Sequence, residues 1–221
     1  MKNHRLLWHW RVSLILLLTV SVFTGCGTSK KVIQSAVSAS RSIEILAVND
    51  MYGAIDNFPR LAFIVDSLRS LYPNMLLVSA GDNQTGNPVN DQYPEKGLPM
   101  IVLMNATGFN LSAVGNHEFD TGIKGLGKLI SQTKFPFLCA SLTNPTDKGL
   151  QIEPYKIVTM PNGVDIAFIS VININSSGIP DRHPDDVKGL TFEKILKAVQ
   201  KYLHLADSVN MVLCLTHGVR S

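Results

Sequence analysis

Short apolar runs alternate with longer stretches of helical spacing along most of this chain. The runs cover residues 43–48, 75–80, 111–114 and 135–138, and each has the length of a buried strand. Residues 58–71 carry apolar side chains at helical spacing and stop at a Pro-Asn turn. This alternation of short and long segments predicts an α/β domain.

The second half of the chain adds elements of both kinds. In residues 155–171 the dipeptide Asn162-Gly163 separates two β-rich runs, which favours a tight hairpin and therefore a mixed sheet. A further strand is expected over residues 209–215. Three more helices are expected, at residues 97–107, 123–133 and 191–206.

The amino-terminal 25 residues follow a different pattern. Lys2, Arg5 and Arg11 precede an apolar run, residues 12–24, that is too short to span a bilayer comfortably. The pattern predicts an export signal, and its end resembles a bacterial lipoprotein signal, in which a cysteine, here Cys26, is acylated. An uncleaved anchor helix, or a plain signal with an incidental cysteine, is the alternative.

This segment leads to a division of the chain into three parts. Residues 1–25 would be removed as a signal peptide, and residues 26–42, rich in Ser, Ala and Lys, would tether a lipid on Cys26 to the domain. The domain would take residues 43–221. We therefore expect an exported protein of the bacterial cell envelope, anchored to the membrane by lipid and either periplasmic or on the cell surface.

The charge balance argues against nucleic acid as a partner. The chain has 221 residues and a formal net charge of +3. Residues 1–25 hold three of the 20 basic residues and none of the 17 acidic ones, so the rest of the chain carries 17 of each sign. It has no basic stripe interleaved with aromatic residues, which is what a nucleic-acid surface requires.

Two cysteines lie in or beside apolar runs of the domain. Cys139 follows residues 135–138, and Cys214 lies within residues 209–215. Because no CxxC or similar spacing is present, both are expected to be buried thiols. A disulfide between them is the alternative, without positive support.

Polar groups able to bind a metal follow four of the apolar runs. Because the carboxyl ends of strands form the ligand-binding edge of an open α/β sheet, we expect a single edge to collect all four. Each group alone could instead cap a helix or a turn, but their repetition in order favours one common site. The groups are Asn49 and Asp50, Asp82, Asn116 and His117, and His217.

Oxygen and imidazole ligands together suit Zn²⁺, Mn²⁺ or iron. A carboxylate can bridge two such ions about 4 Å apart, and the pair could clamp a phosphate ester and lower the pKa of a bound water. His117 precedes Asp120 by three residues, which fits an imidazole that is oriented by a carboxylate and can protonate a leaving oxygen.

Four sequence blocks resemble the 5′-nucleotidase branch of the calcineurin-like metallophosphoesterases over about residues 43–221. The blocks are Asn49-Asp50-x-x-Gly53, Gly81-Asp82-Asn83-Gln84-Thr85-Gly86, Gly115-Asn116-His117-Glu118-Phe119-Asp120 and Thr216-His217-Gly218. The resemblance implies a four-layer αββα sandwich with mixed sheets. It also implies two divalent metal ions and hydrolysis of phosphate monoesters, typically of nucleotides.

The resemblance also implies ligand roles by position. Asp50 would bind the first metal, Asp82 would bridge both, and Asn116 and His217 would bind the second. The family has a histidine two residues after the first aspartate, where this chain has Tyr52. A neutral phenol is a poor ligand at pH 7, so retention of a single ion is the alternative to two.

The resemblance further implies a catalytic dyad and a later histidine block. The catalytic dyad would be His117 with Asp120. A Gly-His-x-His block and a carboxy-terminal domain that recognises the nucleotide are expected in the family and absent from this sequence, so the domain would be incomplete at its carboxyl end. His183 is expected in an exposed loop and His204 on a helix surface, neither as a ligand.

The sequence leaves three hypotheses for the function. The first is a metal-dependent phosphomonoester hydrolase resembling 5′-nucleotidases, in which metal-activated water attacks a nucleotide phosphate. The second is a truncated or degenerate, non-catalytic remnant or binding module. The third is a chain that works with a partner polypeptide carrying the missing half.

Overall fold

A computed structural model describes residues 41–218 of the chain. The predicted signal peptide, Cys26 and nearly all of the predicted tether lie outside the described residues. Among the residues that are described, no helix combines the length and the apolar character that crossing a bilayer requires.

The first sheet contains five parallel strands in sequence order. Helices connect its first four strands, as the alternating pattern predicts. The strands are β1 (Ile45–Val48), β2 (Leu76–Ser79), β3 (Leu111–Ala113), β4 (Phe137–Leu138) and β5 (Ile152–Glu153). The connecting helices are α2 (Phe58–Leu71), α3 (Pro88–Asp91), α4 (Leu98–Thr107) and α5 (Gly122–Ile130).

The second sheet contains three strands, β6 (Tyr155–Thr159), β7 (Asp165–Ile172) and β8 (Met211–His217). The predicted hairpin is confirmed, because β6 and β7 pair antiparallel across the Asn162-Gly163 turn. β7 and β8 pair parallel, so this sheet is mixed whereas the first is wholly parallel.

The helix expected over residues 191–206 is shorter than predicted. It is divided into α6 (Ile195–Gln200) and a 3₁₀ helix, η5 (Leu203–Asp207). The amide groups of Lys201 and Tyr202 donate to carbonyls three residues back, which tightens the turn and ends the α-helix. The other 3₁₀ helices are η1 (Ile55–Asn57), η2 (His117–Thr121), η3 (Thr146–Lys148) and η4 (Pro184–Val187).

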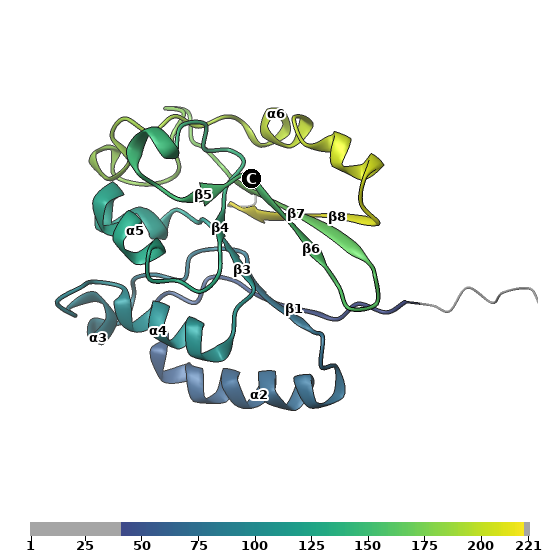
Figure 1. Ribbon diagram of the computed structural model, residues 1–221. Helices are drawn as coiled ribbons and strands as arrows, with labels where there is room; N and C mark the ends of the chain where they lie inside the picture. The colour runs from purple at the N-terminus through teal and green to yellow at the C-terminus, as the bar shows by residue number, and fades with distance from the viewer. Residues whose placement is uncertain (1–40, 219–221) are drawn as a thin grey trace, which may run out of the picture. The chain divides into compact units, whose positions relative to one another are not determined.

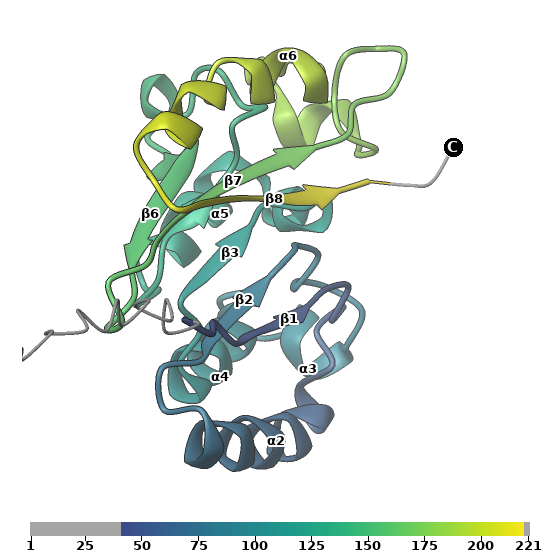
Figure 2. The same cartoon turned by 90° about the vertical axis from the view of Figure 1, so that its right-hand side faces the viewer.

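The two sheets pack face to face between two layers of helices (Figures 1 and 2). In β2, Leu77 joins the core that α2, α4 and α5 cover, while Leu76 and Val78 point into the core between the sheets. In β7, Phe168 points into that same inter-sheet core, and Ile169 belongs to the cluster under α6 and η5. Alternating side chains therefore serve both faces of each buried strand, and the expected four-layer αββα fold is confirmed.

Burial of the two cysteines differs from the sequence expectation. Cys139 is buried, as predicted, whereas Cys214 is exposed, and both are free thiols. The prediction was wrong for Cys214 because β8, among the described residues, pairs only with β7 and lies at an edge of its sheet. An apolar run in an edge strand exposes part of its surface, and the run alone does not show this.

Phe168 tests the inter-sheet core. It is fully buried between the sheets, so Phe168→Ala should lower the free energy of unfolding by about 3–5 kcal/mol. The matched control is Phe63→Ala on α2, where the side chain is 73% exposed and the loss should stay below about 0.5 kcal/mol. Urea unfolding followed by circular dichroism measures both, and similar losses would contradict the layered core.

Candidate functional site

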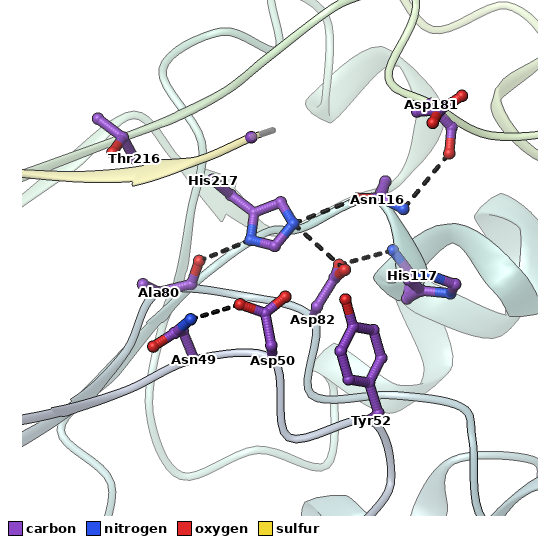
Figure 3. Close-up of a pocket in the computed structure, with 11 residues that line it drawn as sticks. Asn49, Asp50, Tyr52, Ala80, Asp82, Asn116, His117, Asp181, Thr216 and His217 are labelled. Atoms are coloured by element: carbon purple, nitrogen blue, oxygen red, sulfur yellow. Dashed lines mark hydrogen bonds and ion pairs between the residues drawn. The ribbon is translucent and has the colours of Figure 1, made fainter. Parts of the chain in front are cut away.

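The four polar blocks lie around one pocket, but they come from two sheets. Asp50, Asp82 and Asn116 follow β1, β2 and β3 of the first sheet, whereas His217 ends β8 of the second. The expectation of a single sheet edge was therefore wrong. The pocket lies where the carboxyl ends of strands from both sheets meet (Figure 3).

The pocket has a volume of about 560 Å³ and a mostly polar lining. Figure 3 shows the side chains of Asp50, Tyr52, Asp82 and His217 directed toward one another. The lining residues are Asn49, Asp50, Tyr52, Ala80, Asp82, Asn116, His117, Asp181, Thr216, His217 and Gly218.

His217 is oriented by contacts on both of its ring nitrogens. Nδ1 lies 3.0 Å from the carbonyl oxygen of Ala80, which can only accept a hydrogen bond. Nε2 lies 3.2 Å from Oδ2 of Asp82 and 3.2 Å from Oδ1 of Asn116. The amide of Asn116 is held in this orientation because its Nδ2 donates to the carbonyl of Asp181 at 3.3 Å.

This arrangement suits a cation. With Nδ1–H donating to Ala80, a neutral His217 directs the lone pair of Nε2 at two further acceptors, so the cluster is stable only with a proton or a metal ion among these atoms. Asp50, Asp82 and His217 each offer one ligand atom, and these atoms lie within 4.8 Å of one another. The donor set of carboxylate oxygen and imidazole nitrogen fits a divalent transition ion.

Charge coupling within the cluster is visible in two pKa shifts. Burial raises the pKa of Asp82, but the hydrogen bond from His217 and the backbone amide of His117 outweigh it, and the net pKa lies below the usual value. For His217, burial lowers the pKa, but the hydrogen bond to Asp82 and the negative charge of Asp82 outweigh this effect, and the net pKa lies above the usual value of 6.5. Each group therefore stabilises the charged form of the other.

Tyr52 lies in the pocket, at the position where the sequence resemblance implies a histidine. Its hydroxyl points toward Asp50 and Asp82 (Figure 3). The Asp50 carboxylate, as hydrogen-bond acceptor, followed by partial burial, raises the pKa of Tyr52 to about 12. The phenol is therefore neutral at pH 7, and its ring meets that of His117 edge-on with centroids 5.4 Å apart.

Glu118 fixes the loops that carry two of the polar blocks. It is fully buried, and its Oε2 accepts from the backbone amides of Asp82 at 2.9 Å and Gly115 at 2.6 Å. Its Oε1 accepts from the backbone amide of Asn83 at 2.8 Å and from the Asn83 side chain at 3.0 Å. Burial raises the pKa of Glu118, and these amide donors oppose that rise. One carboxylate thus joins the loop after β2 to the loop after β3.

Backbone hydrogen bonds also join the loops after β1 and β2. The amides of Asp50, Tyr52 and Gly53 donate to the carbonyls of residues 81, 82 and 83 at 2.8–3.1 Å. Asp50, Tyr52, Asp82 and Thr85 have positive φ angles of 46–57°, which non-glycine residues rarely adopt. Such strain costs about 1–3 kcal/mol per residue and persists only where surrounding contacts impose it.

Two glycines allow the loops to approach this closely. A Cβ on Gly115 would lie 2.2 Å from Oδ1 of Asp82, and one on Gly81 would lie 2.8 Å from the backbone nitrogen of Gly115. Gly81 also has a φ of +101°, which favours glycine, and a Cβ there would lie 3.0 Å from Nδ1 of His217, so a side chain at this position would crowd the imidazole.

His117 and Asp120 lie side by side next to the cluster of Asp50, Asp82 and His217. Nδ1 of His117 is 3.0 Å from Oδ2 of Asp120, and the backbone amide of His117 donates to Oδ1 of Asp82 at 2.9 Å. The hydroxyl of Thr85 donates to Oδ2 of Asp120 and lies 3.1 Å from Nδ1 of His117. Arg182 pairs with the other oxygen, Oδ1, of Asp120 at 2.5 Å.

Four contributors to the site were missed from the sequence. Glu118 lies in the third block, between residues to which a role was assigned. The sequence signal for its anchoring role is only a carboxylate close to glycine-containing loops. Thr85 gave no signal beyond its place in the second block. Asp181 and Arg182 come from the loop that was expected to be merely exposed, although His183 in that loop is exposed, with 68% of its side chain accessible. His204 is exposed as predicted, in η5 rather than in an α-helix.

Comparisons with known proteins agree with the fold and with the blocks. The family model for calcineurin-like phosphoesterase matches residues 43–220. The chain is 32% identical over 166 residues to a 5′-nucleotidase from Bos taurus, a match that covers 72% of this chain and 28% of that protein. The chain therefore spans well under half the length of this relative.

Two solved structures show the same architecture. The Haemophilus influenzae NAD nucleotidase superposes with a TM-score of 0.67 at 26% identity, over 79% of this chain and 34% of that one. A 5′-nucleotidase structure from Staphylococcus aureus, described as putative, gives a TM-score of 0.70 at 20% identity, over 80% and 38% of the two chains. The second likeness concerns the fold alone.

Glu118→Gln tests the link between the loops. The amide would place an N–H group opposite backbone donors and leave at least one of them unpaired, so we expect a loss of about 3 kcal/mol in the free energy of unfolding. The matched control is Glu95→Gln, a half-buried carboxylate that pairs with the exposed Lys128 and, in the described part of the chain, accepts from no backbone amide, and this change should affect the stability far less. Equal effects in urea unfolding would contradict the role of Glu118.

His217 predicts a pH dependence for protein treated with a chelator. The pKa of His217 in the folded chain lies above its usual value of 6.5, so protonated His217 stabilises the fold. This stability is fully present below pH 6.5 and is lost as the pH rises through the folded pKa. The stability difference between the wild-type chain and His217→Gln should therefore shrink as the pH rises from about 6.5, the usual pKa of a histidine, into the alkaline range. A difference that does not vary over this range would show that His217 is not charged in the metal-free fold.

Proposed function

The chain belongs to the calcineurin-like phosphoesterase family, and on that premise we propose that it is a metal-dependent phosphomonoester hydrolase of the 5′-nucleotidase type, acting on nucleotides. The observation that carries this proposal is the convergence of Asp50, Asp82 and His217 in one pocket, which is also lined by His117, the partner of Asp120. The 5′-nucleotidase relative supports the substrate class, although the chain covers 28% of its length.

We propose that four side chains hold the divalent ions of this family. Asp50 would bind the first, Asp82 would bridge both, and Asn116 with His217 would bind the second. When bound, such ions lower the pKa of water and neutralise charge that develops on a phosphoryl group. Borderline nitrogen and oxygen ligands suit Zn²⁺ or Mn²⁺.

His117 is the proposed proton donor to the leaving oxygen. Among the described residues, all polar contacts of its ring are made by Nδ1, which leaves Nε2 for the pocket that His117 lines. Asp120 holds the ring through Nδ1 and stabilises the imidazolium, which is how a carboxylate supports a histidine acid or base.

A phosphate-release assay tests the proposed reaction. Residues 27–221 with Mn²⁺ or Zn²⁺ should release phosphate from nucleoside monophosphates. Asp82→Ala and His117→Ala should each lower the rate by at least about 10²-fold, the usual effect of removing a general acid or its electrostatic support. His183→Ala, an exposed histidine outside the pocket, is the matched control and should keep the wild-type rate.

The alternative is a non-catalytic binding module, and one observation favours it. Tyr52 is neutral at pH 7 and is a weaker ligand than a histidine, so a single ion would be retained. Calorimetric titration with Mn²⁺ and with nucleoside monophosphate distinguishes the two: binding by a folded protein without turnover under any metal would support the module and contradict the hydrolase.

A partner polypeptide that supplies further histidine ligands is a third proposal. Its motivation is β8, which among the described residues pairs only with β7 and ends in His217 beside the pocket. A strand added parallel to β8 at this edge would bring its own carboxyl end close to Asp50, Asp82 and His217.

We further propose that the protein is exported and lipid-anchored in the bacterial cell envelope. The support is the sequence alone: a basic start, an apolar run over residues 12–24 and then Cys26. Expression in a bacterial host followed by membrane fractionation should place the wild-type chain in the membrane pellet. Cys26→Ala should lack the lipid and leave the membrane pellet, and mass spectrometry should detect the added lipid mass only in the wild-type chain. An unmodified Cys26 in the wild-type chain would refute the proposal.

A further inference from the structure

We propose that Arg182 is a positioning residue for the His117–Asp120 pair, holding Asp120 so that His117 presents Nε2 to the pocket. This inference rests on the proposed function, because it assigns a role in the proposed proton transfer. Arg182 lies in the loop between β7, a strand of the second sheet, and η4.

The contacts of Asp120 divide between its two oxygens. Oδ2 receives the hydroxyl of Thr85 and faces Nδ1 of His117 at 3.0 Å. Oδ1 is buried and has no hydrogen-bond partner among the described residues, and the guanidinium of Arg182 lies 2.5 Å from it. The side chain of Asp120 is only 8% exposed, so this cation is the charge that balances a carboxylate with little access to water.

Arg182 also restricts the imidazole directly. Its Nη1 lies 3.0 Å from Nδ1 of His117, on the same side of the ring as Asp120 and Thr85. A guanidinium can only donate, so while Nδ1–H is donated to Asp120 the Nη1 contact adds no hydrogen bond, and Arg182 acts on the ring by its position beside this edge. A ring flip would place a carbon opposite Oδ2 of Asp120 and turn Nδ1 into the pocket, which the loss of the hydrogen bond to Asp120 opposes.

The loop that carries Arg182 reaches both parts of the site. The carbonyl of Asp181 accepts from Nδ2 of Asn116, and the neighbouring Arg182 pairs with Asp120. A second carboxylate, Asp186, lies 3.6 Å from Nε of Arg182 and is 29% exposed. Arg182 thus bridges a surface carboxylate and a buried one, and its planar guanidinium suits contact with both better than a lysine would.

Variants at residue 182 separate positioning from folding. Arg182→Met should lower kcat by about 10²-fold with KM changed less than about 3-fold, because misplacement affects the proton transfer rather than substrate binding. Arg182→Lys keeps the charge and should recover part of kcat, and added guanidinium ion should partly restore Arg182→Met but not His117→Ala. Asp186→Asn, which leaves the contact to Asp120, is the matched control and should keep the wild-type kcat.

A spectroscopic measurement decides the proposal without turnover. In protein with ¹⁵N-labelled histidine, the Nδ1–H resonance of His117, assigned by its absence in His117→Ala, should shift or broaden in Arg182→Met and stay unchanged in Asp186→Asn. An unchanged resonance together with folded protein would overturn the positioning role. If the wild-type chain shows no phosphate release, the proposed function fails, but this resonance still tests whether Arg182 positions His117.

Discussion

Burial of one carboxylate, Glu118, is the constraint on which the geometry of the site depends. An isolated carboxylate inside a protein is costly, and the cost is offset here by amide donors of Asp82, Asn83 and Gly115. These amides belong to two different loops, so the carboxylate can be satisfied only when both loops adopt one relative position. That position places Asp82 and the start of the His117 block within hydrogen-bond distance of each other.

The second sheet contacts these two loops through a small number of polar interactions. His217 is fixed by Ala80 on one nitrogen and by Asp82 and Asn116 on the other. These contacts require β8 to lie at a definite distance from β2, and that distance is set by the apolar side chains packed between the sheets. The inter-sheet core is therefore not remote from the chemistry, because the width of that core decides where an imidazole from the second sheet can lie.

The fold and the polar blocks could be predicted because both are encoded locally. Apolar runs of four to six residues followed by Asp50, Asp82 and Asn116 mark strand ends without reference to the rest of the chain. The partition into two sheets could not be read in this way, since His217 follows an apolar run like the others. Arg182 and Cys214 were misjudged for a related reason: whether a side chain is buried against Asp120 or exposed at a sheet edge depends on residues distant in the sequence.

The two sides of the pocket differ in what holds them. The loops after β1 and β2 are joined by backbone hydrogen bonds, and these bonds maintain left-handed conformations at Asp50 and Asp82 that would otherwise relax. The carboxylates of Asp50 and Asp82 are therefore oriented without a cation, so binding of one would not have to order them. The segment before Arg182 bonds through its backbone mainly within itself and reaches the site through Asp181 and Arg182. Side-chain and single-carbonyl contacts are easier to break than a ladder of backbone bonds, so we expect the side of the pocket with His117 and Arg182 to adjust more readily than the cluster of Asp50, Asp82 and His217.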